Sequence, residues 1–233
     1  MSLYFISFII HVSFSVRIHI AGITSGLGRE IAYQSCIETN NPDIYITGQC
    51  TESMHQKLMV PCRNGGFEEM DTHKYFSSPR IKLYKFTDSI EKFNNYDALI
   101  LSMSAYNSKD SDFSDDITLK LLQNLPSSCK TIILISAHDV NNLKIFKEKN
   151  LNNTTFYSIY KSKINQESYL SLIKNSNVLI LRPKILSFGR DKNIDNHPGH
   201  ISRKLLAKKI IYKLKKNHNL YMHYNKILNT PMW

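Results

Sequence analysis

The chain has 233 residues, 42% of them hydrophobic, which is typical of one globular domain that buries a sizeable core. Its net charge is +11, but the basic residues do not alternate with aromatic ones as they do in grooves for single-stranded nucleic acid, so we expect no nucleic-acid partner. Its 4 cysteines form no Cys-x-x-Cys pair and no Cys/His cluster, which favours a reducing, cytoplasmic compartment and no metal site.

The first sixteen residues form an apolar lead-in, in which residues 3–16 read LYFISFIIHVSFSV. This run is too short to span a bilayer as a helix, and it lacks the basic start and small-residue cleavage site of a signal peptide. We therefore expect residues 1–16 to be an extension, with the translation start assigned too early, and residues 17–233 to be the domain. A tail that associates with membranes is the alternative.

Short apolar runs then alternate with helix-like segments along the chain. The predicted strands are Arg17–Ala21, Asp43–Thr47, Ile81–Lys85, Ala98–Ser102, Thr131–Ser136 and Val178–Arg182, with Leu220–Met222 as a further edge strand. The predicted helices are Leu27–Thr39, Asp116–Leu125, Thr155–Asn175 and Ser202–Asn217. This alternation predicts a single α/β domain with a doubly wound parallel sheet, whose ligand lies at the carboxyl ends of the strands. Residues 50–80 carry no such pattern and are expected to be rich in loops.

The last predicted helix has an apolar side and a basic side. Its apolar residues recur at helical spacing, which predicts that they pack on the sheet. Its basic residues are expected to form a solvated face: Arg203, Lys204, Lys208, Lys209, Lys213, Lys215 and Lys216.

A glycine-rich turn, Gly22-Ile23-Thr24-Ser25-Gly26-Leu27-Gly28, separates the first predicted strand from the first predicted helix. Glycines let a backbone turn tightly and approach a pyrophosphate, and the free amides at the start of a helix face the anion. The order of strand, glycine turn and helix therefore predicts a phosphate cradle. Its spacing, Gly-x-x-x-Gly-x-Gly, resembles that of the short-chain dehydrogenase/reductase family.

A second motif lies on the third predicted helix, where Tyr157 and Lys161 are one turn apart. A Tyr hydroxyl can exchange a proton with a substrate oxygen, and a nearby Lys ammonium favours the phenolate. Tyr212 and Lys216 repeat the motif on the Lys-rich helix, where an aromatic residue is expected to have no catalytic role. The first copy lies between an apolar strand that ends in Ser136 and a strand followed by Pro183, and these surroundings are similar to the family's catalytic region.

The resemblance covers residues 17–183, and it implies a Rossmann-type fold and an NAD(P)-dependent hydride transfer between nicotinamide and a carbonyl or alcohol. It implies that Tyr157 is the acid/base, that Lys161 is its ribose-binding partner, and that Ser136 orients the substrate carbonyl. The implied cofactor-binding residues are Gly22, Thr24, Ser25, Gly26, Leu27, Gly28, Ser102, Lys161, Pro183 and Ile185. It also implies a small-molecule substrate, and family members often form homo-oligomers.

Gln49 bears on the choice between NADP and NAD. An acidic residue at the end of the second strand would bind the ribose 2′-hydroxyl and repel a 2′-phosphate. Gln49 and its neighbours supply none, so NADP is favoured over NAD, and Gln49 joins the expected cofactor-binding residues.

The chain departs from the family pattern after the fourth strand, where Leu101-Ser102-Met103-Ser104 replaces an Asn-Asn-Ala-Gly segment. Two alternatives to an active reductase therefore stay open. One is a catalytically weak, nucleotide-binding sensor or scaffold on the same fold. The other is an epimerase or dehydratase that acts on a nucleotide sugar, which the long segment between Ser136 and Tyr157 favours.

Overall fold

The computed structural model describes residues 15–38, 42–50, 58–61, 67–70, 76–103, 108–138, 140, 155–183, 185–187 and 200–219. The predicted N-terminal extension, apart from its last two residues, and the predicted edge strand at 220–222 lie outside these ranges.

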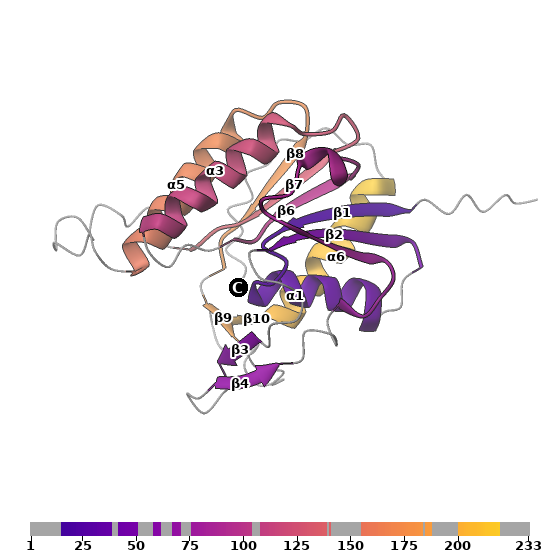
Figure 1. The fold of residues 1–233 in the computed structure, drawn as a ribbon, viewed down its shortest axis with the longest axis horizontal. Coiled ribbons are helices and arrows are strands. Elements are labelled where there is room, and N and C mark those ends of the chain that lie inside the picture. Colours follow the sequence, from indigo (N-terminus) through magenta and orange to yellow (C-terminus); the bar gives the residue numbers. More distant parts are fainter. Residues whose placement is uncertain are drawn as a thin grey trace, which may run out of the picture.

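Six parallel strands form the central sheet in the order β5-β2-β1-β6-β7-β8 (Figure 1). Their bounds are Val16–Ala21 for β1, Ile44–Cys50 for β2, Ile81–Lys85 for β5, Ala98–Leu101 for β6, Thr131–Ile135 for β7 and Asn177–Leu181 for β8. Each strand lies within a few residues of its predicted position. The order of strands reverses between β1 and β6, which is the arrangement of a Rossmann-type doubly wound sheet. The predicted fold class is confirmed.

Helices cover both faces of this sheet (Figure 1). On one face lie α1 (Gly26–Tyr33), which continues as the π-helical turn η1 (Gln34–Glu38), and α6 (Arg203–Asn219). On the other face lie α3 (Ser108–Gln123) and α5 (Thr155–Ser171), which pack against each other. A short 3-10 turn, η2 (Ile90–Lys92), precedes β6. The sheet is therefore buried on both faces, which explains why its strands are continuous apolar runs.

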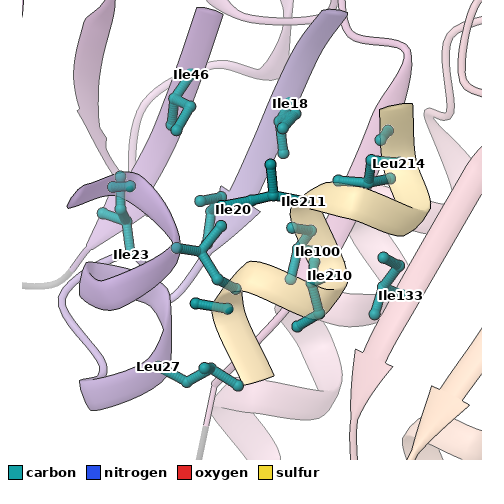
Figure 2. Packing of buried hydrophobic residues seen from close by; sticks show 14 of the residues in the cluster. Ile18, Ile20, Ile23, Leu27, Ile46, Ile100, Ile133, Ile210, Ile211 and Leu214 are labelled. Atoms are coloured by element: carbon teal, nitrogen blue, oxygen red, sulfur yellow. The ribbon is translucent and has the colours of Figure 1, made fainter. Parts of the chain in front are cut away.

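The core beneath α1 and α6 is built mainly from isoleucine and leucine (Figure 2). Ile18, Ile20 and Ile100 project from the strands toward Ile210 and Ile211 of α6. The predicted apolar side of this helix is confirmed, since its buried residues are Leu206, Ala207, Ile210, Ile211 and Leu214.

Two small sheets flank the large one. The antiparallel pair β3 (Leu58–Pro61) and β4 (Phe67–Met70) falls in the region that we expected to be loops. The parallel pair β9 (Ile185–Ser187) and β10 (His200–Ser202) directly precedes α6. Both pairs consist of strands of three or four residues, which are too short to show a periodic pattern in the sequence.

No helix in the described part of the chain is long and apolar enough to cross a membrane. Within the same residues, no group of three or more His, Cys, Asp and Glu side chains could hold a metal ion.

Candidate functional site

The glycine-rich turn lies at the carboxyl end of β1, beside the point where the strand order reverses. Gly22 has a φ of +83°, a backbone conformation that residues with a Cβ rarely adopt. Its amide and that of Ile23 both donate to the carbonyl of Gln49, at 3.0 and 3.1 Å. Ile23 is fully buried, and a Cβ on Gly48 would lie 2.3 Å from its Cδ1. The turn is therefore fixed to β2 by two hydrogen bonds and one buried side chain.

Ser25 begins α1 and connects the turn to β6. Its Oγ accepts a hydrogen bond from the amide of Gly28 at 3.0 Å, as an N-cap residue does. The same Oγ lies 2.9 Å from Oγ of Ser102, which follows β6 and donates to the carbonyl of Gly22 at 3.0 Å. Four of the residues predicted to bind cofactor are thus brought together across the junction between β1 and β6.

The surroundings of Gly28 and Gly26 show whether this turn fits a phosphate group. A Cβ on Gly28 would lie 2.4 Å from the carbonyl oxygen of Gly22, so the helix can approach the strand only with glycine there. Gly26 and Leu27 occupy the first turn of α1, where amides have no carbonyl partner within the helix. The Leu27 side chain is buried in the core, so this residue can offer only its backbone. Thr24 is half-buried beside them. The geometry fits a bound pyrophosphate.

The side chain of Gln49 does not lie at the open edge of the sheet. It is 2% exposed, and its Oε1 lies 3.1 Å from Nε2 of His19. His19 is buried at the centre of β1, where its Nδ1 lies 2.8 Å from Oγ1 of Thr47 and its ring stacks on Phe93. Burial lowers the pKa of His19 to about 4, so the ring is neutral at pH 7. Gln49 thus contributes its carbonyl to the turn and its side chain to this buried polar pair.

Tyr157 and Lys161 both lie on α5, and each is half-buried. The Lys161 ammonium is 4.0 Å from Oδ1 of Asp112 on α3, and the pair is open to solvent, with 45% of the Lys161 side chain and 73% of the Asp112 side chain exposed. Because solvent screens such a pair, it holds Lys161 only weakly. The predicted motif is therefore present on one helix, with its lysine directed toward α3.

Ser136 is buried at the end of β7 and lies at a different level of α5. Its hydroxyl donates to Oε1 of Glu167 at 2.5 Å, and Glu167 is also paired with Arg182, whose Nε lies 2.9 Å from the same oxygen. Glu167 follows Tyr157 by ten residues, which is a rise of about 15 Å along the helix. The structure therefore does not bring Ser136 next to Tyr157.

Lys163 was not singled out in the sequence, although it is the buried cation of this region. Its side chain is 4% exposed, and its Nζ donates to the carbonyl of Met103 and to Oε1 of Gln166. Burial lowers the pKa of Lys163 to about 8, while the nearby carboxylates of Asp115 and Glu167 act in the opposite direction.

The hydrogen bond from Lys163 to the carbonyl of Met103 places the lysine ammonium near the glycine turn. Met103 packs directly on the turn, since a Cβ on Gly22 would lie 3.0 Å from its amide nitrogen. Lys163 therefore brings a positive charge to the corner where the turn meets β6. Lys161 can be identified in the sequence because it lies one helical turn after Tyr157, whereas the burial of Lys163 depends on how α5 packs.

Two further predicted residues follow β8. Pro183 is half-buried at its carboxyl end, and Ile185 begins β9. The segments 104–107, 141–154 and 188–199, which follow β6, β7 and β9 in the chain, lie outside the described residues.

No model of a protein family matches the chain, and no curated protein is significantly similar to it in sequence. Solved structures are similar in fold. A candidate NADH-flavin reductase of Streptococcus pneumoniae has a TM-score of 0.61 at 12% identity, over 88% of this chain and 95% of that one. A candidate NAD-dependent epimerase/dehydratase of Bacillus halodurans has a TM-score of 0.60 at 13% identity, over 89% and 91%.

An anaerobillin reductase of Escherichia coli O157:H7 has a TM-score of 0.56 at 14% identity, over 91% of this chain and 95% of that one. At such low identities the likeness concerns the fold. It covers nearly the full length of each of these three proteins, and it agrees with the Rossmann-type sheet described above.

Proposed function

We propose that the protein is an NAD(P)-dependent oxidoreductase of the short-chain dehydrogenase/reductase type, acting on a small carbonyl or alcohol substrate. The observation that carries the proposal is the glycine turn at the reversal of strand order, where Gly22, Ser25, Gly28 and Ser102 form one hydrogen-bonded unit. Structural likeness to proteins named as reductases supports the same class.

The cofactor would be held by the backbone of Gly26 and Leu27 and by the hydroxyl of Ser25. When bound, the nicotinamide supplies or accepts the hydride, and the protein supplies position and proton transfer. NADP is favoured over NAD because β2 ends in Gln49 and Cys50, without a carboxylate to repel a 2′-phosphate. Fluorescence titration with NADPH and NADH tests both points, and tighter binding of NADH would contradict the preference.

Tyr157 is the residue to which we assign proton transfer to the substrate oxygen. Lys161, one turn further along α5, would stabilise the phenolate and contact the ribose. Ser136 takes no part in this assignment, because its hydroxyl donates to Glu167 and the structure does not bring it next to Tyr157.

Tyr157→Phe tests this assignment, because it removes one hydroxyl and leaves the rest of the helix unchanged. We expect cofactor binding to persist and kcat to fall by about 10²–10⁴-fold in a carbonyl-reduction assay. Tyr212→Phe is the matched control, since Tyr212 has the same motif spacing but is 68% exposed on α6. Equal effects of the two substitutions would refute the assignment.

A nucleotide-sugar epimerase or dehydratase is the second candidate, and the structural likeness to the Bacillus halodurans protein supports it. Such an enzyme regenerates its cofactor in each cycle, so cofactor that stays bound through purification would favour it. Cofactor binding without turnover on a broad panel of carbonyl compounds would instead favour a sensor or scaffold.

A further inference from the structure

Arg203, the first residue of α6, does not lie on the solvated face that the sequence predicts for it. It is half-buried, and its side chain crosses over Gly26. A Cβ on Gly26 would lie 2.7 Å from Nε of Arg203 and 3.3 Å from Cζ. The guanidinium therefore lies beside the residue at which the backbone of a nucleotide-binding turn approaches the pyrophosphate.

The N-termini of α1 and α6 both carry the partial positive charge of a helix dipole. The N-terminal turn of α1 and that of α6 contain no acidic residue, although carboxylates are favoured at such ends. Instead, α6 begins with Arg203 and Lys204, which places cations at the positive end of its dipole. Since α1 packs against α6, two helix N-termini and one guanidinium meet around Gly26. This concentration of positive charge is suited to an anion.

The position of Arg203 is set by the structure that precedes it. Ser202 ends β10, and its Oγ accepts a hydrogen bond from the amide of Leu205 at 3.1 Å, which fixes the start of α6. Through β10, the start of the helix is paired with β9, which follows Pro183 closely in the chain. Arg203 thus connects the glycine turn with the segment of Pro183 and Ile185, which is expected to bind cofactor.

We propose that Arg203 binds the pyrophosphate of the cofactor and forms the second side of the cradle, opposite the amides of α1. This inference rests on the proposed function. A pyrophosphate fits better than the 2′-phosphate of NADP, because Arg203 lies over Gly26, whereas the 2′-phosphate is expected at the end of β2. A guanidinium can donate two parallel hydrogen bonds to phosphate oxygens.

Arg203→Gln tests the proposal through the dissociation constants of NADPH, NADH and ADP-ribose, measured by calorimetry. All three ligands contain the pyrophosphate, so we expect all three constants to rise by a similar factor of about 10–100. Arg203→Lys keeps a charge but loses the bidentate geometry, and it should have a smaller effect. Lys215→Gln removes one charge from an exposed position further along the same helix, and it should change none of the three constants.

The outcomes separate this inference from the proposed function. Unchanged affinities in folded Arg203→Gln, with circular dichroism as the check, would show that Arg203 only packs against the turn and would overturn the inference. A loss confined to NADPH would assign Arg203 to the 2′-phosphate and would overturn it as well. If the unsubstituted protein binds none of the three ligands, the proposed function fails first. If Arg203→Gln does not fold, Arg203→Lys decides, and the inference fails if Arg203→Lys binds NADH as tightly as the unsubstituted protein.

Discussion

Gly26 and Gly28 are separated by one residue, yet an added methyl group would meet different obstacles at the two positions. At Gly28 it would meet the backbone carbonyl of Gly22 at 2.4 Å and Cα of Ile23 at 2.9 Å. At Gly26 the three nearest atoms all belong to the side chain of Arg203, which can move. These two glycines of the motif therefore differ, because Gly28 permits the packing of α1 and Gly26 leaves room for the side chain of Arg203.

Gly28→Ala is accordingly expected to lower the free energy of unfolding by about 1–3 kcal/mol, because backbone must shift to relieve the overlap. Urea denaturation measures this loss. Gly26→Ala should leave the free energy of unfolding nearly unchanged and should weaken NADPH binding instead. If Gly26→Ala destabilises the protein as much as Gly28→Ala does, the guanidinium is held as rigidly as the backbone and this distinction is wrong.

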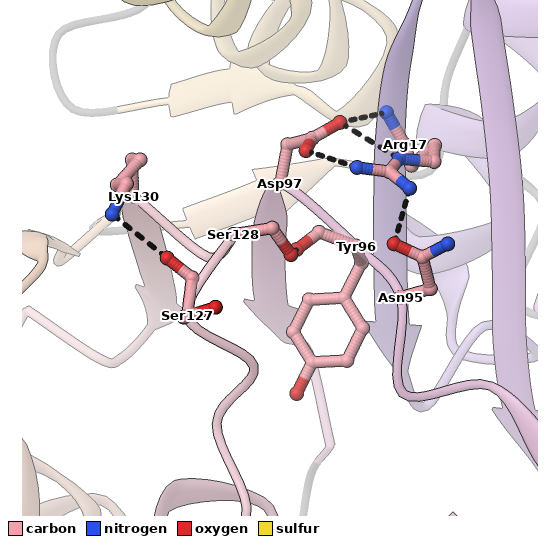
Figure 3. Close-up of polar contacts among 7 residues, drawn as sticks. All are labelled: Arg17, Asn95, Tyr96, Asp97, Ser127, Ser128 and Lys130. Carbon is pink, nitrogen blue, oxygen red and sulfur yellow. Dashed lines mark hydrogen bonds and ion pairs between the residues drawn. The ribbon is translucent and has the colours of Figure 1, made fainter. Parts of the chain in front are cut away.

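The register between β1 and β6 is held by side chains at the end opposite to the glycine turn (Figure 3). The guanidinium of Arg17 donates to both carboxylate oxygens of Asp97, from Nη2 at 2.8 Å and from Nε at 3.2 Å. The backbone amide of Arg17 donates to the same carboxylate at 2.9 Å, and its side chain also contacts Asn95. The hydrogen bond with Asp97 raises the pKa of Arg17, which stabilises the charged guanidinium. Pairing of the two strands from this end brings Ser102 to Gly22.

Asp97→Asn should therefore lower the free energy of unfolding by about 1–2 kcal/mol, because a half-buried bidentate pair and a hydrogen bond to a backbone amide are both weakened. Chemical denaturation at low and high salt measures the loss. Asp88→Asn is the matched control, since Asp88 precedes η2 and pairs with Lys92 in an exposed contact, so this substitution should have a smaller effect. An equal loss for the two substitutions would contradict the role of Arg17 and Asp97 in holding the strands.

The stability of the whole molecule should depend on pH through His19. Burial lowers its pKa from 6.5 to about 4, so between these values the unfolded chain takes up a proton that the folded protein does not. The stability that neutral His19 contributes to the folded protein is fully present above pH 6.5, and it is lost as the pH falls toward 4. It amounts to about 3 kcal/mol, at 1.4 kcal/mol for each pH unit.

Urea denaturation at several values between pH 7 and pH 4.5 measures this dependence. His19→Asn cannot titrate in this range, so its stability should fall less steeply with acid than that of the unsubstituted protein. Other groups that titrate, among them the carboxylates, are common to both proteins and cancel in the comparison. Parallel curves would show that His19 does not carry the effect.

The features that local sequence determines were predicted correctly. Buried parallel strands need runs such as Thr131–Ile135, and an amphipathic helix such as α6 needs apolar residues at helical spacing, so both can be recognised from neighbouring residues. The glycine turn is likewise local, because the positive φ of Gly22 is a property of one residue. Together these features predicted the six strands and their parallel arrangement.

The tertiary structure alone decided which side chains meet at that edge. Ser102 reaches Ser25 across 77 residues of sequence, Ser136 pairs with Glu167 rather than lying beside Tyr157, and Arg203 crosses over Gly26. Contacts between distant residues depend on how helices rotate and pack against the sheet, and helical spacing cannot specify which neighbour a polar side chain will meet. For the same reason, the motif spacing identifies Lys161 in the sequence, whereas Lys163 is the lysine that is buried near the turn.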